Sequence, residues 1–124
     1  RAVEALYLRD EETGARWTVS PAPMGRAQTC NVRHGSGFTR WTKQSHGLDQ
    51  EMTAFTAPSA PVKLVRLRLT NQLEQPRRVT ATYYAEWLLG ALPSRGRDHI
   101  LCNYDERSGA VFARSHWSPD FAGR

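Results

Sequence analysis

Strict alternation of apolar and polar residues is the feature that most constrains how this chain folds. In the segment Val62–Thr70, the apolar residues Val65, Leu67 and Leu69 are separated by arginines. Successive side chains of a β-strand point to opposite faces of the sheet, so a period of two residues puts all three on one face. The segment therefore predicts a strand with one buried face and one solvated face.

A second alternating run, Val79–Leu89, follows after a polar loop, and the two runs predict an antiparallel hairpin. In such a strand Trp87 falls on the apolar face, which predicts that it packs in the core. The alternative is a helix whose apolar stripe consists of Tyr84, Trp87, Leu88, Ala91 and Leu92. The threonine- and valine-rich start of the run and Gly90 favour the strand.

Polar segments that contain glycine predict turns between further short strands. The predicted turns are 10–14, 45–47 and 105–109. The strands beside them are 6–9 with 16–19, 38–44 with 48–55, and 100–104 with 110–114. At 124 residues the chain has the length of one domain. Short strands at this spacing, without a convincing long helix, predict an all-β fold built as an antiparallel β-sandwich or barrel.

The charge of the chain does not by itself predict a nucleic-acid-binding protein. The formal net charge is +5, and a basic balance favours anionic partners. However, every basic residue except Lys43 and Lys63 is an arginine, and the arginines stand singly or in pairs along the chain. Scattered, solvated arginines explain this pattern better than a basic arm that binds nucleic acid.

The carboxylates do not predict a catalytic acid–base pair. A glycosidase needs two carboxyl groups that face the scissile bond from different elements. The acidic clusters at 10–12 and 105–106 lie in predicted turns, where we expect ordinary solvated side chains. Asp49 and Glu51 share one face of a predicted strand, which is typical of a wet sheet surface. We therefore expect no catalytic residue in this chain.

The sequence also predicts no metal, cofactor or nucleophile site. The histidines have no partner at the spacing of a zinc site, and no G-x-S-x-G motif is present. Cys30 and Cys102 are too far apart along the chain to indicate a disulfide framework. One bridge is the alternative, but we expect two reduced, part-buried thiols.

The segment around Arg33 and the tryptophans contain the candidates for contact with a ligand. Arg33 and His34, followed by glycines at 35 and 37, offer a cation and backbone N–H groups to a sugar or a phosphate. A glycine turn with exposed polar side chains is the simpler interpretation. Trp17 and Trp41 suit either the core or a surface on which sugar rings stack.

Short motifs, taken in their order along the chain, carry a family resemblance. They are Leu6–Asp10 with Gly14 and Trp17, Arg33–Arg40 with Ser45–Gly47, Val62–Asn71 with Tyr84, Glu86, Leu89 and Gly90, and Asp120–Arg124. Together they resemble the N-terminal β-sandwich of glycoside hydrolase family 94, once called glycosyltransferase family 36. The likeness spans nearly the whole chain. It is strongest to the cyclic β-1,2-glucan synthase branch, beside the cellobiose and chitobiose phosphorylases.

The resemblance implies that residues 1–124 form a single partial domain, part of a galactose mutarotase-like supersandwich within a larger enzyme. It implies reversible, inverting phosphorolysis of a β-glucosidic bond, with the catalytic Asp in a separate (α/α)₆ barrel. The implied partners are this barrel, a β-glucan or glucoside, and inorganic phosphate. We expect no nucleic-acid partner and no cofactor. The implied location is the cytoplasmic side, in an inner-membrane parent protein.

No catalytic residue of the family is carried over to this chain, because the barrel lies outside it. The candidate residues at the rim of a carbohydrate or phosphate site are Arg33, His34, Trp41 and His46. The sequence therefore predicts a non-catalytic, carbohydrate-facing module. The alternatives are an independent module that binds glucan or nucleic acid and, third, a complete small hydrolase.

Overall fold

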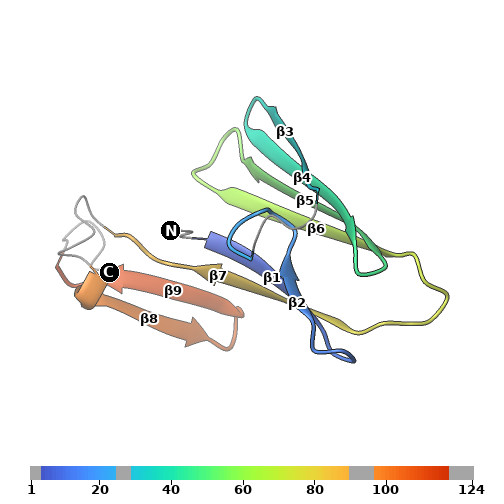
Figure 1. Ribbon diagram of the computed structural model, residues 1–124. Helices are drawn as coiled ribbons and strands as arrows, with labels where there is room; N and C mark the ends of the chain where they lie inside the picture. The colour runs from blue at the N-terminus through green and yellow to red at the C-terminus, as the bar shows by residue number, and fades with distance from the viewer. Residues whose placement is uncertain (1–3, 25–28, 90–96, 118–124) are drawn as a thin grey trace. The chain divides into compact units, whose positions relative to one another are not determined.

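The computed structural model describes residues 4–24, 29–89 and 97–117 of the chain (Figure 1). These residues form β-strands and one short 3₁₀ helix, which confirms the predicted all-β class. They divide into two compact units, Arg1–Tyr84 and Ala85–Arg124, and each unit is described by itself.

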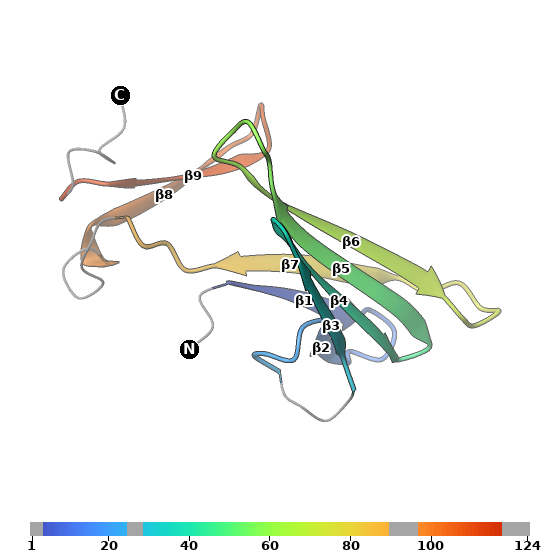
Figure 2. The ribbon, with the colours of Figure 1, turned by 90° about the horizontal axis from the view of Figure 1, so that it is seen from above.

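The first unit consists of two sheets. One sheet has the strand order β2–β1–β7, from Arg16–Thr18, Glu4–Asp10 and Val79–Ala85. The other has the order β3–β4–β5–β6, from Asn31–Gly35, Phe38–Ser45, Leu48–Thr56 and Lys63–Asn71. Viewed from above, the four-stranded sheet lies across the three-stranded one (Figure 2).

The predicted turns connect antiparallel neighbours, as expected. β1 pairs with β2 across the acidic loop, and β4 pairs with β5 across a two-residue turn. In that turn His46 has a φ of 55° and Gly47 a φ of 68°. Positive φ at both central residues matches the right-handed twist of the flanking strands and so favours a tight hairpin. The predicted strands at 38–44 and 48–55 are therefore confirmed.

The expected hairpin between Val62–Thr70 and Val79–Leu89 is wrong. β6 pairs with β5, whereas β7 lies beside β1 in the opposite sheet, so the polar loop between them crosses from one sheet to the other. The strand also ends at Ala85, and Trp87 is 41% exposed rather than packed in the core. The remainder of the alternative helical stripe, from Gly90 on, lies outside the described residues.

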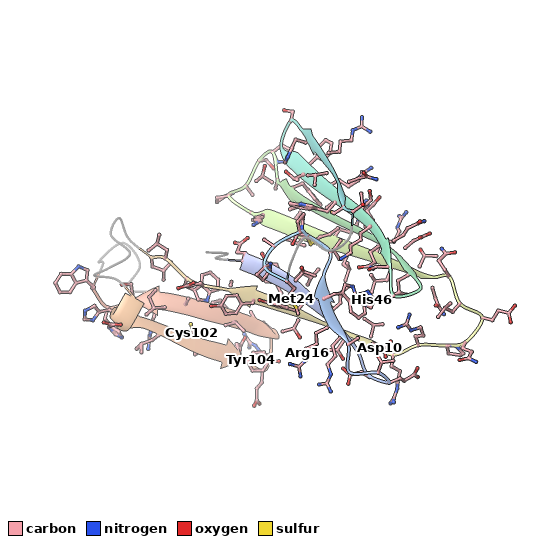
Figure 3. All side chains as sticks on the ribbon, in the orientation of Figure 1. Asp10, Arg16, Met24, His46, Cys102 and Tyr104 are labelled. Carbon is pink, nitrogen blue, oxygen red and sulfur yellow. The ribbon has the colours of Figure 1, made fainter. Side chains whose placement is uncertain are left out.

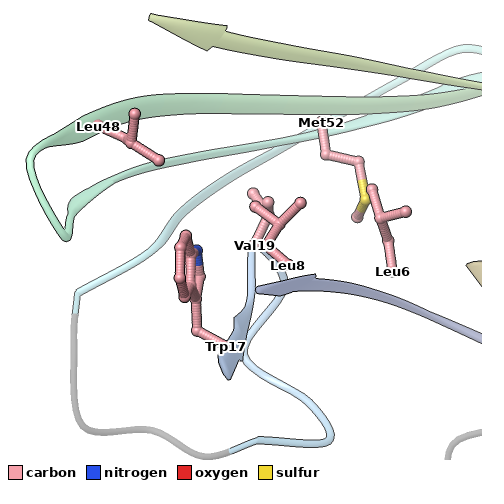
Figure 4. Packing of buried hydrophobic residues seen from close by; sticks show 6 residues of the cluster. All are labelled: Leu6, Leu8, Trp17, Val19, Leu48 and Met52. Carbon is pink, nitrogen blue, oxygen red and sulfur yellow. The ribbon is translucent and has the colours of Figure 1, made fainter. Parts of the chain in front are cut away.

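The core lies between the two sheets, which confirms the sandwich. The three-stranded sheet and the residues directly after β2 contribute Leu6, Leu8, Trp17 and Val19, and β5 contributes Leu48 and Met52 (Figure 4). The predicted apolar face of β6 packs against this cluster and consists of Val65, Leu67 and Leu69. Full burial of one such side chain contributes about 1.5–3 kcal/mol, so the facing sheets hold each other in place.

A polar side chain is buried beside this core. Gln50 is only 2% exposed, and its Oε1 accepts a hydrogen bond of 2.8 Å from the Trp17 indole Nε1. Its Nε2 donates to the Ser45 carbonyl oxygen at 3.1 Å and to the Ser45 hydroxyl at 2.8 Å. Because both ends of the amide are paired, the burial of Gln50 costs little and fixes the position of β2 against β5.

The second unit contains the predicted second hairpin. A 3₁₀ turn at Arg97–His99 leads into β8, Ile100–Asp105, which pairs with β9, Ala110–Ser115. Exposed apolar side chains occur on both strands and include Leu101, Tyr104, Val111 and Phe112. Cys102 of β8 is exposed, contrary to the expected partial burial, whereas Cys30 of the first unit is half-buried; both thiols are free.

We predict that Trp17→Phe lowers the free energy of unfolding by about 1–3 kcal/mol. The phenyl ring keeps the apolar contacts but leaves Gln50 Oε1 buried without its donor. Urea denaturation followed by circular dichroism measures the difference. The matched control is Trp117→Phe, because Trp117 is 62% exposed. Equal stabilities of the two variants would contradict the role assigned to the indole N–H.

Candidate functional site

The four rim candidates do not converge on one site. Arg33 lies directly opposite Arg40 on the outer face of the four-stranded sheet, away from the core. His34 faces the other way, and its Nδ1 lies 3.0 Å from the Thr39 hydroxyl oxygen. Trp41 shares that inner face with His34, since paired residues of neighbouring strands point to the same side.

Trp41 belongs to the interior of the sandwich rather than to a sugar-stacking surface. It packs against the core cluster and lines a small hollow of about 110 Å³. Met52 and Val65 line the same hollow, and an ion pair between Glu4 and Lys63 lies at its side. The hydrogen bond between the two side chains, assisted by their opposite charges, lowers the pKa of Glu4 and raises the pKa of Lys63.

His46 is held at one end of the first unit by packing and hydrogen bonds. Its ring stacks on Trp17, with the centroids 4.1 Å apart and the planes inclined by 10°. Its Nδ1 lies 3.0 Å from the Ser45 hydroxyl oxygen. Partial burial, together with the positive charges of Lys43 and Arg77, lowers the pKa of His46. These effects favour the neutral form of the imidazole, whose ring covers Trp17 at the edge of the core.

Asp10 lies at the same end of the unit, as Figure 3 shows, and it is not the solvated loop residue that the sequence predicts. The residue is 1% exposed. Its Oδ1 accepts hydrogen bonds from the backbone N–H groups of Glu12 and Thr13, at 2.8 and 3.1 Å. Its Oδ2 accepts from Arg77 Nη2, while Arg77 Nη1 donates to the carbonyl oxygen of His46.

Arg77 therefore joins three loops. It links the β1–β2 turn at Asp10 to the β4–β5 turn at His46, from its own place in the loop between β6 and β7. The guanidinium and the two N–H groups lower the pKa of Asp10 from 3.8 to about 2. A general acid needs a carboxyl group that keeps its proton near neutral pH, so Asp10 is a structural anion and not a catalytic acid.

The outer face of the four-stranded sheet carries two hollows. The larger one has a volume of about 770 Å³ and a polar lining drawn from all four strands, which includes Asn31, Thr42, Gln44, Asp49, Glu51, Arg68 and Thr70. These amide, hydroxyl, carboxylate and guanidinium groups both donate and accept hydrogen bonds, as sugar hydroxyl groups require. Asp49 and Glu51 lie on this solvated face, as the sequence predicts.

The second hollow, of about 570 Å³, lies at the other end of the same face and combines apolar with cationic side chains. Phe38 and Phe55 are direct cross-strand partners in its lining. Arg40 and Arg66 border them, and the Arg40 guanidinium carbon lies 6.0 Å from the centre of the Phe38 ring. Arg33 is the direct cross-strand neighbour of Arg40 on this face.

Several buried polar residues escape sequence reasoning, among them Asp10, Gln50 and Thr53. Alternation places Gln50 on the inner face, but it does not reveal that Trp17, more than thirty residues away, supplies the donor. For Asp10 a local signal exists. An Asp at the start of a glycine-ended loop often accepts hydrogen bonds from the backbone N–H groups that follow it.

Comparison with known proteins gives the family. The model of the glycosyl hydrolase 94 supersandwich domain matches residues 1–124. The chain belongs to this family. The resemblance expected from the sequence motifs is thus confirmed, and the two facing sheets of the first unit agree with a supersandwich.

Curated relatives of the glycosyl hydrolase 94 chain are long proteins. Cyclic beta-(1,2)-glucan synthase NdvB of Rhizobium meliloti (strain 1021) is 33% identical over 125 residues, which cover 100% of this chain and 4% of the relative. N,N'-diacetylchitobiose phosphorylase of Vibrio furnissii is 28% identical over 80% of this chain and 13% of the relative. The enzyme of that name from Vibrio proteolyticus is 22% identical over the same shares. The chain thus spans a small part of each relative.

Residues 4–24, 29–89 and 97–117 bring no three His, Cys, Asp or Glu side chains together in the manner of a metal site. They also include no helix that is long and apolar enough to cross a membrane.

We predict that the stabilising effect of the Asp10–Arg77 pair disappears in acid. The pKa of Asp10 is depressed in the folded state, so its contribution is complete above pH 3.8 and is lost as the pH falls towards 2. The difference in urea midpoint between the native chain and Arg77→Met should therefore be largest near neutral pH and shrink through this window. Arg16→Met, which removes an exposed arginine of β2, is the control. A difference independent of pH would show that packing, not charge, dominates.

Proposed function

We propose that this chain is a non-catalytic β-sandwich module of a carbohydrate-active enzyme of the cyclic β-1,2-glucan synthase or β-glycoside phosphorylase type. Residues 1–124 act as one partial domain of the parent protein. The module packs on a separate (α/α)₆ barrel that carries out the chemistry with inorganic phosphate. It borders the glucan site of that barrel, on the cytoplasmic side of an inner-membrane parent.

The observation that carries the proposal is the family match over the whole chain, together with relatives that are named as a glucan synthase and as phosphorylases. The electrostatics support the non-catalytic part. The carboxyl groups of Glu4, Asp10 and Asp105 all have lowered pKa values, held down chiefly by hydrogen bonds from Lys63, Arg77 and Ser108. An inverting glycosidase or phosphorylase instead needs an acid whose pKa is raised.

The outer face of the four-stranded sheet supports the carbohydrate-facing part. Its larger hollow presents groups that match sugar hydroxyls, and Arg33 lies on the same face as the lining residue Asn31. Among the rim candidates, Arg33 is therefore the best placed to meet a glucan. Trp41 and His46 act indirectly in this proposal, because they hold the inner side of the sheet and one of its turns.

An independent glucan-binding module is the second candidate, and the same polar hollow favours it. The two proposals differ in what the chain does without the rest of the parent protein. A non-catalytic module that borders a barrel leaves most of the affinity for glucan to that barrel. An independent module binds glucan alone with the affinity of the intact protein.

We expect the chain alone to release no sugar phosphate from β-glucosides and to bind β-1,2-glucan at least about tenfold more weakly than the full-length protein. About tenfold corresponds to roughly 1.4 kcal/mol of binding free energy supplied by other parts of the protein. Isothermal titration of both proteins, with phosphate release or uptake measured in parallel, checks this.

In the full-length protein, Arg33→Ala should raise KM for the glucan severalfold and leave kcat unchanged, which is the pattern of lost ground-state binding. Arg16→Ala, which removes an exposed arginine on the other sheet, is the matched control. Turnover by the chain alone would overturn the non-catalytic assignment. Unchanged KM in Arg33→Ala would remove Arg33 from the rim.

A further inference from the structure

A row of cationic side chains crosses the outer face of the four-stranded sheet. Arg33 of β3 lies opposite Arg40 of β4, Arg40 opposite Thr53 of β5, and Thr53 opposite Arg66 of β6. Like charges directly opposite each other destabilise a sheet. The direct pairing of Arg33 with Arg40 therefore costs the fold some stability.

Glu51 offsets this charge only in part. One of its carboxylate oxygens lies 3.8 Å from Arg40 Nε and the other 3.3 Å from Arg66 Nη2. One carboxylate thus faces two guanidinium groups, and Arg33 adds a third positive charge beside them. The neighbourhood retains a positive potential that attracts anions.

Unpaired buried atoms mark the same place. Thr53 is 6% exposed, and its hydroxyl oxygen has no hydrogen-bond partner within the part of the chain that the structure describes. Arg40 Nε is also buried and makes no hydrogen bond within these residues, although the Glu51 carboxylate lies 3.8 Å from it. Buried polar groups are paired in most proteins, and an unpaired one costs about 1–3 kcal/mol. An unpaired hydroxyl group next to a guanidinium nitrogen that lacks a hydrogen bond indicates a ligand that pairs with both.

The second hollow of this face has the shape and chemistry for such a ligand. Thr53, Arg40 and Arg66 line it together with the rings of Phe38 and Phe55. Guanidinium groups and a hydroxyl bind the oxygens of an anion, and Arg does so with two parallel hydrogen bonds. The two phenyl rings form an apolar wall beside these groups, which suits an uncharged part of the same ligand.

Gly35 makes room for one of the two phenyl rings that line the hollow. Gly35 lies opposite Phe38, and a Cβ atom at position 35 would overlap the Phe38 ring. The absence of a side chain at Gly35 thus leaves room for the Phe38 ring at the end of β3. The β3–β4 turn closes with Gly37, whose φ of 76° only glycine adopts at little cost.

We propose that this hollow is a binding site for a small phosphate-type oxyanion. Arg40, Arg66 and Thr53 hold the oxygens, and Phe38 and Phe55 contact an ester group where one is present. The site is a second hollow on the same face, next to Glu51 of the polar hollow, and it does not depend on the proposed function.

The test is isothermal titration of the full-length protein with inorganic phosphate and with phenyl phosphate. We expect both to bind, and phenyl phosphate to bind more tightly because its ring meets the phenylalanines. Arg66→Gln, whose side chain is 55% exposed in the native chain, should weaken this site at least about tenfold, which a lost charge-assisted hydrogen bond predicts. The charge-matched control, Arg16→Gln on the other sheet, should leave binding unchanged.

Thr53→Val separates the site from the fold. Valine keeps the shape and removes the unpaired hydroxyl, so the melting temperature should stay equal or rise while phosphate affinity falls. Tighter binding of phenyl phosphate identifies an ester as the ligand, and preference for inorganic phosphate identifies the free ion. Absence of binding, or equal binding by the native protein, Arg66→Gln and Thr53→Val, would overturn the proposal.

Discussion

The structure of the first unit depends on two apolar sheet faces that bury each other. Neither sheet is stable with its inner face in water, and the residues that meet come from distant parts of the chain. The hydrogen bond between Trp17 and Gln50 sets which residues of the two faces meet, because any slip would leave a buried donor and acceptor unpaired. Apolar burial supplies the stability, and this buried polar contact helps to set the register.

The end of the sandwich is closed by charge rather than by apolar packing. Arg77 bridges Asp10 and the carbonyl of His46, while the His46 ring lies flat on Trp17. This arrangement explains how the chain crosses between the sheets after β6 without exposing the core at that edge. It also explains why a histidine tolerates a positive φ here, since the ring gains a stacked partner and the backbone a hydrogen bond.

The outer face of the four-stranded sheet carries the side chains that we propose for recognition. A rigid sheet presents side chains at fixed spacing, and this one presents a polar region at one end and an aromatic, cationic region at the other. The chain belongs to the glycosyl hydrolase 94 supersandwich family, and for this reason a carbohydrate is the ligand that we propose for the polar region. In the proposed function, the chemistry of the parent enzyme belongs to other parts of the protein, and this module contributes shape and charge beside it.

The sequence by itself determined the all-β class and the hairpins around residues 10–14, 45–47 and 105–109, because turn residues and alternation are local signals. It also determined the family, through short motifs in their order along the chain. It also placed Asp49 and Glu51 on a solvated face. Only the tertiary structure decided that β6 and β7 belong to different sheets, that Asp10 is buried, and that Trp41 faces inward. The physical reason is that alternation states which side of a strand is apolar, whereas the partner across the core is chosen by packing between residues far apart in the chain.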